Sequence, residues 1–137
     1  MKRIPKWCSA LVATFAIYFP AAVWLKATCC DTPRAPEGIA LRIARPFEKV
    51  QDAPLVAVAR LEALDDVADT EEHPERSPFL LYENTLLLGP PHSFHDEIRE
   101  NGMGRYSHWR GLGLLISSSD GTDPKSNGRT YWLVRRP

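Results

Sequence analysis

Cysteine is scarce in this 137-residue chain, and none follows Cys30. The three cysteines are Cys8 and the adjacent pair Cys29 and Cys30, a pattern that excludes a disulfide-stapled scaffold and a zinc site of paired cysteines. Net charge is lacking too, because 17 basic residues face 17 acidic ones. That balance excludes a nucleic-acid binder held by a general basic surface. No glycine-rich phosphate loop is present, and 12 prolines and 8 glycines disfavour long helices outside one segment.

The zero net charge is the sum of three unlike regions. Residues 1–30 have four basic residues and no acid, whereas residues 31–98 have six basic and fourteen acidic residues. Residues 99–137 have seven basic and three acidic residues, so the middle of the chain is acidic and both ends are basic. Six of the acids stand between Asp65 and Pro78 beside a single basic residue, which predicts a solvated loop.

The N-terminal segment has the pattern of a membrane anchor. Trp7 to Leu25 is a run of 19 residues without charge, preceded by three basic residues and followed by Lys26. This length matches a membrane-spanning helix, and the basic flank is expected to stay in the cytoplasm. We therefore expect residues 7–25 to anchor the chain in a bacterial inner membrane with its C-terminal domain in the periplasm. Cleavage as a signal peptide followed by secretion, or lipidation near Cys29, remains an alternative.

The rest of the chain has the pattern of a small β domain. Two prolines and a glycine at residues 31–38 predict a linker, so the folded domain is expected over residues 39–137. Hydrophobic patterning predicts strands at residues 39–43, 55–61, 79–83, 86–88, 111–117 and 130–134. A capping box that starts at Ser93 predicts a helix closed by Gly102, with Phe94 and Ile98 on its packed face. We expect a mainly β fold, a small antiparallel sandwich or open barrel with one short helix, preceded by one N-terminal transmembrane helix.

The most distinctive motif lies between Arg105 and Arg129. It contains Tyr106-Ser107-His108-Trp109, then Ser118-Ser119-Asp120-Gly121-Thr122-Asp123-Pro124, then Asn127-Gly128-Arg129 with Tyr131. Together with Leu81-Tyr82-Glu83 and Leu88-Gly89-Pro90-Pro91-His92, this pattern resembles a small module of bacterial cell-surface polysaccharide proteins, spanning about residues 78–135. In those proteins the module is an accessory to glycosyltransferases and methyltransferases. The resemblance implies an accessory role and brings no reaction of its own.

This motif has two interpretations. In the structural one, Asp120-Gly121 and Asn127-Gly128 form turns, Asp123 and Asn127 brace the loop, and Arg129 is a bidentate partner for a carboxylate. In the functional one, the motif binds a glycan, because planar rings stack on sugar faces while polar groups supply directional hydrogen bonds. The candidate ligand-binding residues are Tyr106, Trp109, Asp120, Asn127, Arg129 and Trp132.

Metal sites and catalytic residues are weaker hypotheses. A zinc site could use His92, His95 and His108 with Asp96 behind them, and a calcium site could use Asp120, Asp123 and Asn127. His92 precedes the helix cap and His95 lies just inside it, so the two are not expected to share a facing. The calcium set lacks the alternating spacing of a calcium loop, so we expect no metal and no cofactor. Ser107 and His108 are neighbours on a strand and point to opposite faces, so they cannot act as nucleophile and base, and no catalytic residue is expected.

These patterns predict a function class rather than a reaction. We expect a membrane-anchored extracytoplasmic accessory domain, non-enzymatic, in surface-polysaccharide assembly or glycan binding. A structural single-pass subunit of a larger membrane complex is the alternative, because small residues such as Ala10, Ala13 and Ala16 would let helices approach closely. A small enzyme of unknown reaction is the third hypothesis. The expected partners are the membrane, membrane proteins and a glycan, and not nucleic acid.

Overall fold

The computed structural model describes residues 18–21 and 35–136. The chain divides into two units, Met1–Thr32 and Pro33–Pro137. In the first unit the described residues 18–21 form an exposed helical turn. The rest of the predicted anchor at residues 7–25, and the Cys29–Cys30 pair, lie outside the described residues. In the part of the chain that is described, no helix is long and apolar enough to span a bilayer.

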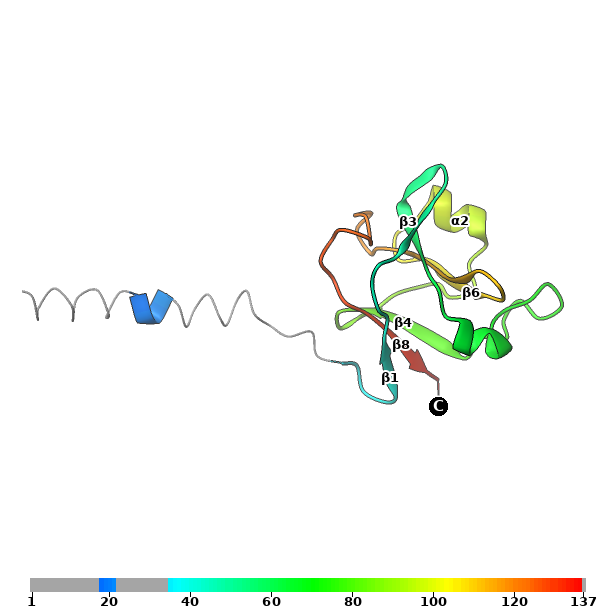
Figure 1. Cartoon of the computed structure of the whole chain (residues 1–137), viewed down its shortest axis with the longest axis horizontal. Coiled ribbons are helices and arrows are strands. Elements are labelled where there is room, and N and C mark those ends of the chain that lie inside the picture. The colour runs from blue at the N-terminus through cyan, green and yellow to red at the C-terminus, as the bar shows by residue number, and fades with distance from the viewer. Residues whose placement is uncertain (1–17, 22–34, 137) are drawn as a thin grey trace, which may run out of the picture. The chain divides into compact units, whose positions relative to one another are not determined.

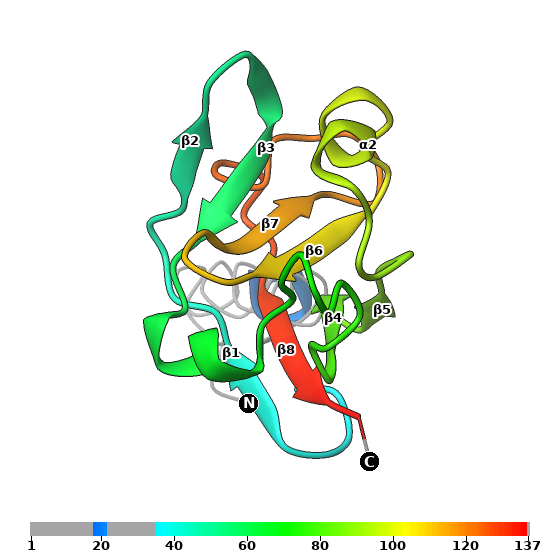
Figure 2. The ribbon, with the colours of Figure 1, turned by 90° about the vertical axis from the view of Figure 1, so that its right-hand side faces the viewer.

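The second unit is mainly β, as predicted, and consists of two antiparallel four-stranded sheets (Figures 1 and 2). In spatial order, the first sheet contains β1 (Ala40–Arg42), β8 (Tyr131–Arg135), β4 (Phe79–Glu83) and β5 (Leu86–Leu87). The second sheet contains β2 (Glu48–Val50), β3 (Ala53–Ala59), β7 (Gly113–Ser117) and β6 (Tyr106–Trp109). A two-residue turn that begins at Asn84 joins β4 to β5, which confirms the predicted hairpin.

The two sheets share one hydrophobic core. Because successive side chains of a strand point to opposite faces, β7 contributes Leu114 and Ile116 to one side and Leu115 to the other. Leu114 and Ile116 belong to the same cluster as Leu81 of β4 and Leu133 of β8. The first sheet therefore packs against this face of the second sheet.

The outer face of the second sheet is covered by the helix α2 (His95–Glu100). Its Ile98 is fully buried among Val56, Val58 and Leu115. The predicted end of the helix is confirmed, since Gly102 has a φ of 57° and its amide donates to the Ile98 carbonyl at 3.1 Å. The prediction for Phe94 was wrong, because that side chain is 75% exposed.

The predicted capping box is also wrong. The residue before the helix is Phe94, and no side chain caps the first turn. The Ser93 hydroxyl instead donates to the Pro90 carbonyl at 2.8 Å, so it stabilises the turn that leads into the helix.

One strand and one buried segment were not predicted. The strand is β2, which has only three residues. The strand expected to carry Ser107 and His108 is confirmed as β6. The acidic stretch predicted to be a solvated loop begins inside a 3-10 helix, η1 (Glu62–Val67), and then enters the fold. Asp69 is completely buried, accepts at its carbonyl from the Arg110 amide, and donates its own amide to the His108 carbonyl at 2.8 Å. This segment therefore extends the second sheet beyond β6.

Candidate functional site

Strand alternation on β6 separates the YSHW part of the motif into two faces. Tyr106 lies in the core between the sheets, and the His108 ring packs against Phe79 with 5.7 Å between ring centroids. Ser107 and Trp109 point the other way and line a pocket on the outer side of the second sheet. The opposite facing of Ser107 and His108 agrees with the expectation that they do not pair.

The burial of Tyr106 removes it from the candidate glycan-binding residues. Its side chain is 2% exposed, its hydroxyl oxygen accepts from the Leu81 amide at 3.1 Å, and its hydroxyl donates to the Phe79 carbonyl at 3.4 Å. Burial raises the pKa of this phenol above its ordinary value. Tyr106 therefore fastens β6 to β4 and has no face available for a ligand.

The pocket beside Trp109 has a volume of about 340 Å³. Its walls come from the acidic segment that contains Asp69, the turn before α2, the first residues of α2, and β6. We call it the Trp109 pocket, and its lining residues are Asp69, Pro74, Glu75, His92, Ser93, Phe94, His95, Asp96, Ser107 and Trp109. Of the six predicted ligand-binding residues, only Trp109 lies here.

Asp69 orients His92 at the wall of this pocket. One oxygen of the fully buried Asp69 carboxylate accepts from the Ser77 amide at 2.7 Å, and the other lies 2.8 Å from His92 Nδ1. Since an ionised carboxylate only accepts, Nδ1 is the nitrogen that carries the proton in this bond. His92 also has a φ of 55°, a left-handed conformation that is uncommon for a residue with a side chain. The Asp69 bond therefore holds both the ring and the strained backbone in place.

Two polar atoms around the pocket have no hydrogen-bond partner among the described residues. They are Ser107 Oγ and His95 Nε2, and both are buried. The His95 ring packs edge-on against Trp109, with 5.4 Å between centroids, and burial lowers the pKa of His95. A buried polar group without a partner lowers stability by about 1–3 kcal/mol, so these two atoms destabilise the fold around the pocket.

The third histidine of the predicted zinc site lies elsewhere. His108 Nδ1 is 3.0 Å from Ser77 Oγ on the core side of β6, and burial lowers the pKa of its ring. It therefore faces away from His92 and His95. Within residues 18–21 and 35–136, no three His, Cys, Asp or Glu side chains are placed to hold a metal ion.

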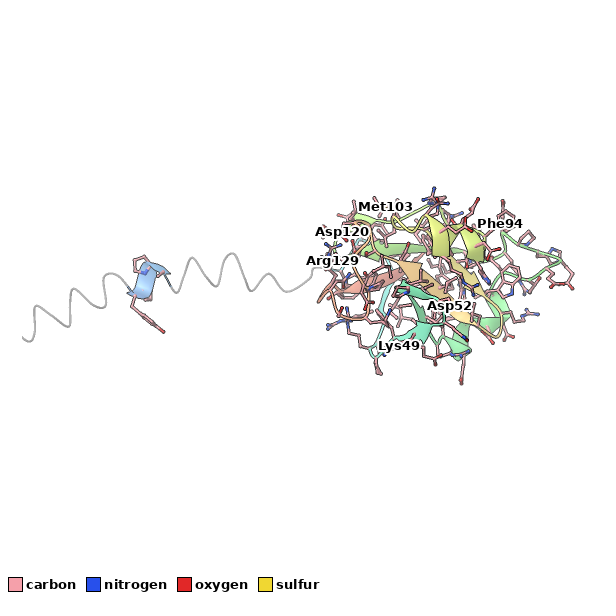
Figure 3. The ribbon with its side chains drawn as sticks, turned by 90° about the horizontal axis from the view of Figure 1, so that it is seen from above. Lys49, Asp52, Phe94, Met103, Asp120 and Arg129 are labelled. Atoms are coloured by element: carbon pink, nitrogen blue, oxygen red, sulfur yellow. The ribbon has the colours of Figure 1, made fainter. Side chains whose placement is uncertain are left out.

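The polar residues of the DGTDPKSNGR part of the motif form a separate cluster, which we call the Arg129 network. Its members are Glu83, Ser119, Asp120, Asn127, Arg129 and Tyr131. Figure 3 shows Asp120 and Arg129 together at one end of the domain, well apart from Phe94 of the Trp109 pocket. The two halves of the motif therefore occupy different places.

Arg129 is the centre of this network. Its guanidinium donates to both carboxylate oxygens of Asp120 and to Glu83 Oε2, at 2.9 Å for Nη1 to Asp120 Oδ1 and 3.0 Å for Nη1 to Glu83. These bonds lower the pKa of Asp120 and raise that of Arg129. The predicted bidentate pairing of Arg129 with a carboxylate is thus confirmed, and this use of Asp120 leaves no room for the calcium hypothesis.

Glu83 is the buried acceptor of the same network. It is 3% exposed, and it accepts from the Tyr131 hydroxyl at 2.8 Å and from the Ser119 hydroxyl. Asn127 donates to the Tyr131 oxygen at 2.9 Å and accepts from the Arg129 amide at 3.1 Å, which confirms its predicted bracing role. Asp123 accepts from the Lys125 amide at 2.9 Å and likewise braces the loop.

Trp132 belongs to neither cluster. It is half-buried on β8, between Arg42 of β1 and Tyr82 of β4, and its Nε1 is buried without a partner among the described residues. The six candidate residues are therefore not brought together into one site. Sequence reasoning also missed Asp69, because nothing nearby distinguishes it from the five other acids of its segment.

No family model, no curated protein and no solved structure matches this chain. Its function is therefore inferred from its own residues.

Proposed function

We propose that this chain is a membrane-anchored extracytoplasmic accessory domain of surface-polysaccharide assembly, and that it binds a saccharide in the Trp109 pocket. The charge-free run at residues 7–25 supports the anchor, and the motif of residues 78–135 supports the polysaccharide context. The observation that carries the binding site is the presence of Trp109 and the unpartnered Ser107 Oγ in one pocket of about 340 Å³. An aromatic wall with a few unsatisfied polar groups is the arrangement expected of a small-ligand site.

The Arg129 network is a poorer site for a ligand. Each of its six side chains already bonds to another member, so a saccharide would have to break these bonds before making its own. In the Trp109 pocket, by contrast, a sugar hydroxyl would gain a partner that the protein leaves free. We therefore assign binding to Trp109 and loop bracing to Asp120, Asn127 and Arg129.

Calorimetric titration tests this proposal. The full chain, in mild detergent, is titrated with a panel of neutral, acidic and amino oligosaccharides. Trp109→Ala should weaken binding at least about tenfold, because it removes the stacking surface, and Trp109→Phe should retain part of the affinity. Trp132→Ala is the matched control, since it removes a half-buried tryptophan outside the pocket. Failure of the whole panel, or unchanged binding by Trp109→Ala, would contradict the proposal.

The structural-subunit hypothesis is favoured by a different observation. Leu86 and Leu87 form the edge strand β5 and are 54% and 50% exposed, which is unusual for two adjacent leucines on a sheet edge. Such an edge can add a strand from a partner protein. Extraction in mild detergent tests it: fixed partners that are lost in a Leu86→Ser, Leu87→Ser variant support a subunit, and a lone monomer contradicts it.

A further inference from the structure

The charges around the Trp109 pocket have one sign. Asp69, Glu75 and Asp96 contribute carboxylates to its lining, and no lysine or arginine is among the described lining residues. Asp69 already bonds to His92 at 2.8 Å. The pairing of Asp96 is loose, because Arg99 Nη1 lies 3.9 Å from Asp96 Oδ1 and the Asp96 side chain is 86% exposed. Exposed pairs of this kind neutralise a carboxylate only weakly. The pocket therefore favours a cation over an anion.

The hydrogen-bonding groups of the pocket are mostly acceptors. Since Nδ1–H of His92 donates to Asp69, a neutral His92 keeps Nε2 as an acceptor, and this atom has no bond to any described residue. The carboxylates of Glu75 and Asp96 are acceptors as well. A ligand that presented carbonyl or carboxylate oxygens here could form no hydrogen bonds with these acceptors. A ligand rich in N–H or O–H groups would donate hydrogen bonds to them.

Ser107 supplies an independent sign that something binds. It lines the pocket, its side chain is only 2% exposed, and its Oγ has no partner among the described residues. Ser107 is neutral and lies on strand β6, so its missing hydrogen bond is an observation separate from the carboxylates of the pocket. Its unmet hydrogen bond points to a ligand group in the pocket.

From this inventory we infer that the saccharide carries a free amino group, so that the ligand class is a cationic amino sugar. This inference rests on the proposed saccharide site. An ammonium group brings a positive charge and three N–H donors to a pocket lined by carboxylates, and it can also approach the face of Trp109. N-acetylation removes the charge, leaves one donor and adds a carbonyl acceptor. The pocket should therefore distinguish the two forms of one sugar.

The test compares two forms of one oligosaccharide on the full chain in mild detergent. The probes are the β-1,4-linked glucosamine tetramer and its fully N-acetylated form, titrated calorimetrically at one pH and ionic strength. The free amine form should bind about tenfold more tightly, which is the size expected when charge-assisted hydrogen bonds are lost. Glu75→Gln with Asp96→Asn should bring the two affinities close to each other.

A matched double variant controls for the change in net charge alone. Glu71→Gln with Glu97→Gln makes the same change in net charge on the same two segments, but both residues are exposed and lie outside the pocket lining. It should keep the preference for the amine form. Equal binding of the two tetramers, or an equal loss of preference in both double variants, would overturn the amino-sugar inference and leave the saccharide site standing. No binding of any member of the wider panel would overturn the proposed function itself.

Discussion

The Arg129 network and the Trp109 pocket each take some of their residues from the motif between Arg105 and Arg129, and they differ in one physical respect. In the network, each side chain has a hydrogen-bond partner in the protein, and the buried Glu83 collects three of these bonds. In the pocket, Ser107 Oγ and His95 Nε2 have none among the described residues. The polar groups of the network hold a loop in place, whereas these two polar groups of the pocket stabilise nothing within the described part of the chain.

The contrast explains why one motif contains so many polar residues. The chain between β7 and β8 has no strand of its own, and the described domain contains no cysteine that could staple it. A network fixed on the buried Glu83 replaces such a staple by tying this loop to β4. Nothing comparable is needed at β6, which is already held by β7 on one side and by Asp69 on the other.

The largest effect should come from removing the buried acceptor of the network. Glu83→Ala is expected to lower the free energy of unfolding by about 3–5 kcal/mol, because the side-chain bonds from Ser119, Arg129 and Tyr131 to this buried carboxylate are all lost. Urea unfolding measures it. Glu48→Ala is the control: Glu48 also pairs with an arginine, Arg60, at 2.9 Å, but both side chains are half exposed, so a much smaller change is expected. If both variants lost similar free energies of unfolding, Glu83 would stabilise the fold no more than an exposed ion pair does, which would contradict the prediction.

A smaller loss of stability is expected when the Tyr131 hydroxyl, which bonds to the same Glu83 carboxylate, is removed. Tyr131→Phe should lower the free energy of unfolding by about 2 kcal/mol, since its hydroxyl donates to the charged Glu83 and accepts from Asn127. Tyr106→Phe is the natural comparison, because its hydroxyl bonds only to neutral backbone groups. It should cost about half as much, near 1 kcal/mol, in the same urea experiment. A greater cost for Tyr106→Phe would show that charge is not what makes the network strong.

The parts of this structure that were predictable depend on local signals. The strand at Phe79–Glu83 and the turn at Asn84 follow from a short apolar run after Pro78 and from one turn residue. The pairing of Arg129 with a carboxylate lies within a single loop, so turn residues and charge were enough to indicate it, and the structure identifies the partner as Asp120. A mainly β domain follows from several such short signals taken together.

The parts that could not be predicted depend on contacts between distant residues. Asp69 meets His92 across 23 positions, and Glu83 meets Arg129 across 46. No periodicity or spacing marks Asp69, since Asp65 and Asp66 stand beside it in the same acidic run and remain outside the core. Only the docking of its backbone against β6 buries it. The prediction of a uniformly solvated loop therefore failed at the one acid that tertiary structure selects.

The core side of β6 and the Arg129 network should also lose stability at different pH. Burial lowers the pKa of His108 below its ordinary 6.5, so below that pH the unfolded chain binds more protons than the folded one and the free energy of unfolding falls. The bonds from Arg129 lower the pKa of Asp120 below 3.8, so its contribution is complete above that pH and disappears only in stronger acid.

Urea unfolding across a pH series separates these windows. His108→Asn should flatten the decline that begins near pH 6.5, though not abolish it, because burial lowers the pKa of His95 as well. Asp120→Asn should leave that decline unchanged, lower the free energy of unfolding by a constant amount above about pH 3.8, and lose this effect only in stronger acid. An unchanged slope in His108→Asn would mean that this histidine is not held in its neutral form.

The smallest expected effect discriminates most directly between the two regions, because it compares two serines. Ser119→Ala removes a donor to the buried Glu83 and should lower the free energy of unfolding by about 1 kcal/mol. Ser107→Ala removes a hydroxyl with no partner among the described residues, so stability should stay within about 0.5 kcal/mol or rise. Saccharide affinity should respond in the opposite way, falling several-fold in Ser107→Ala and staying constant in Ser119→Ala. If Ser107→Ala instead cost as much stability as Ser119→Ala, its hydroxyl would belong to the fold, and the Trp109 pocket would lose its clearest sign of a ligand.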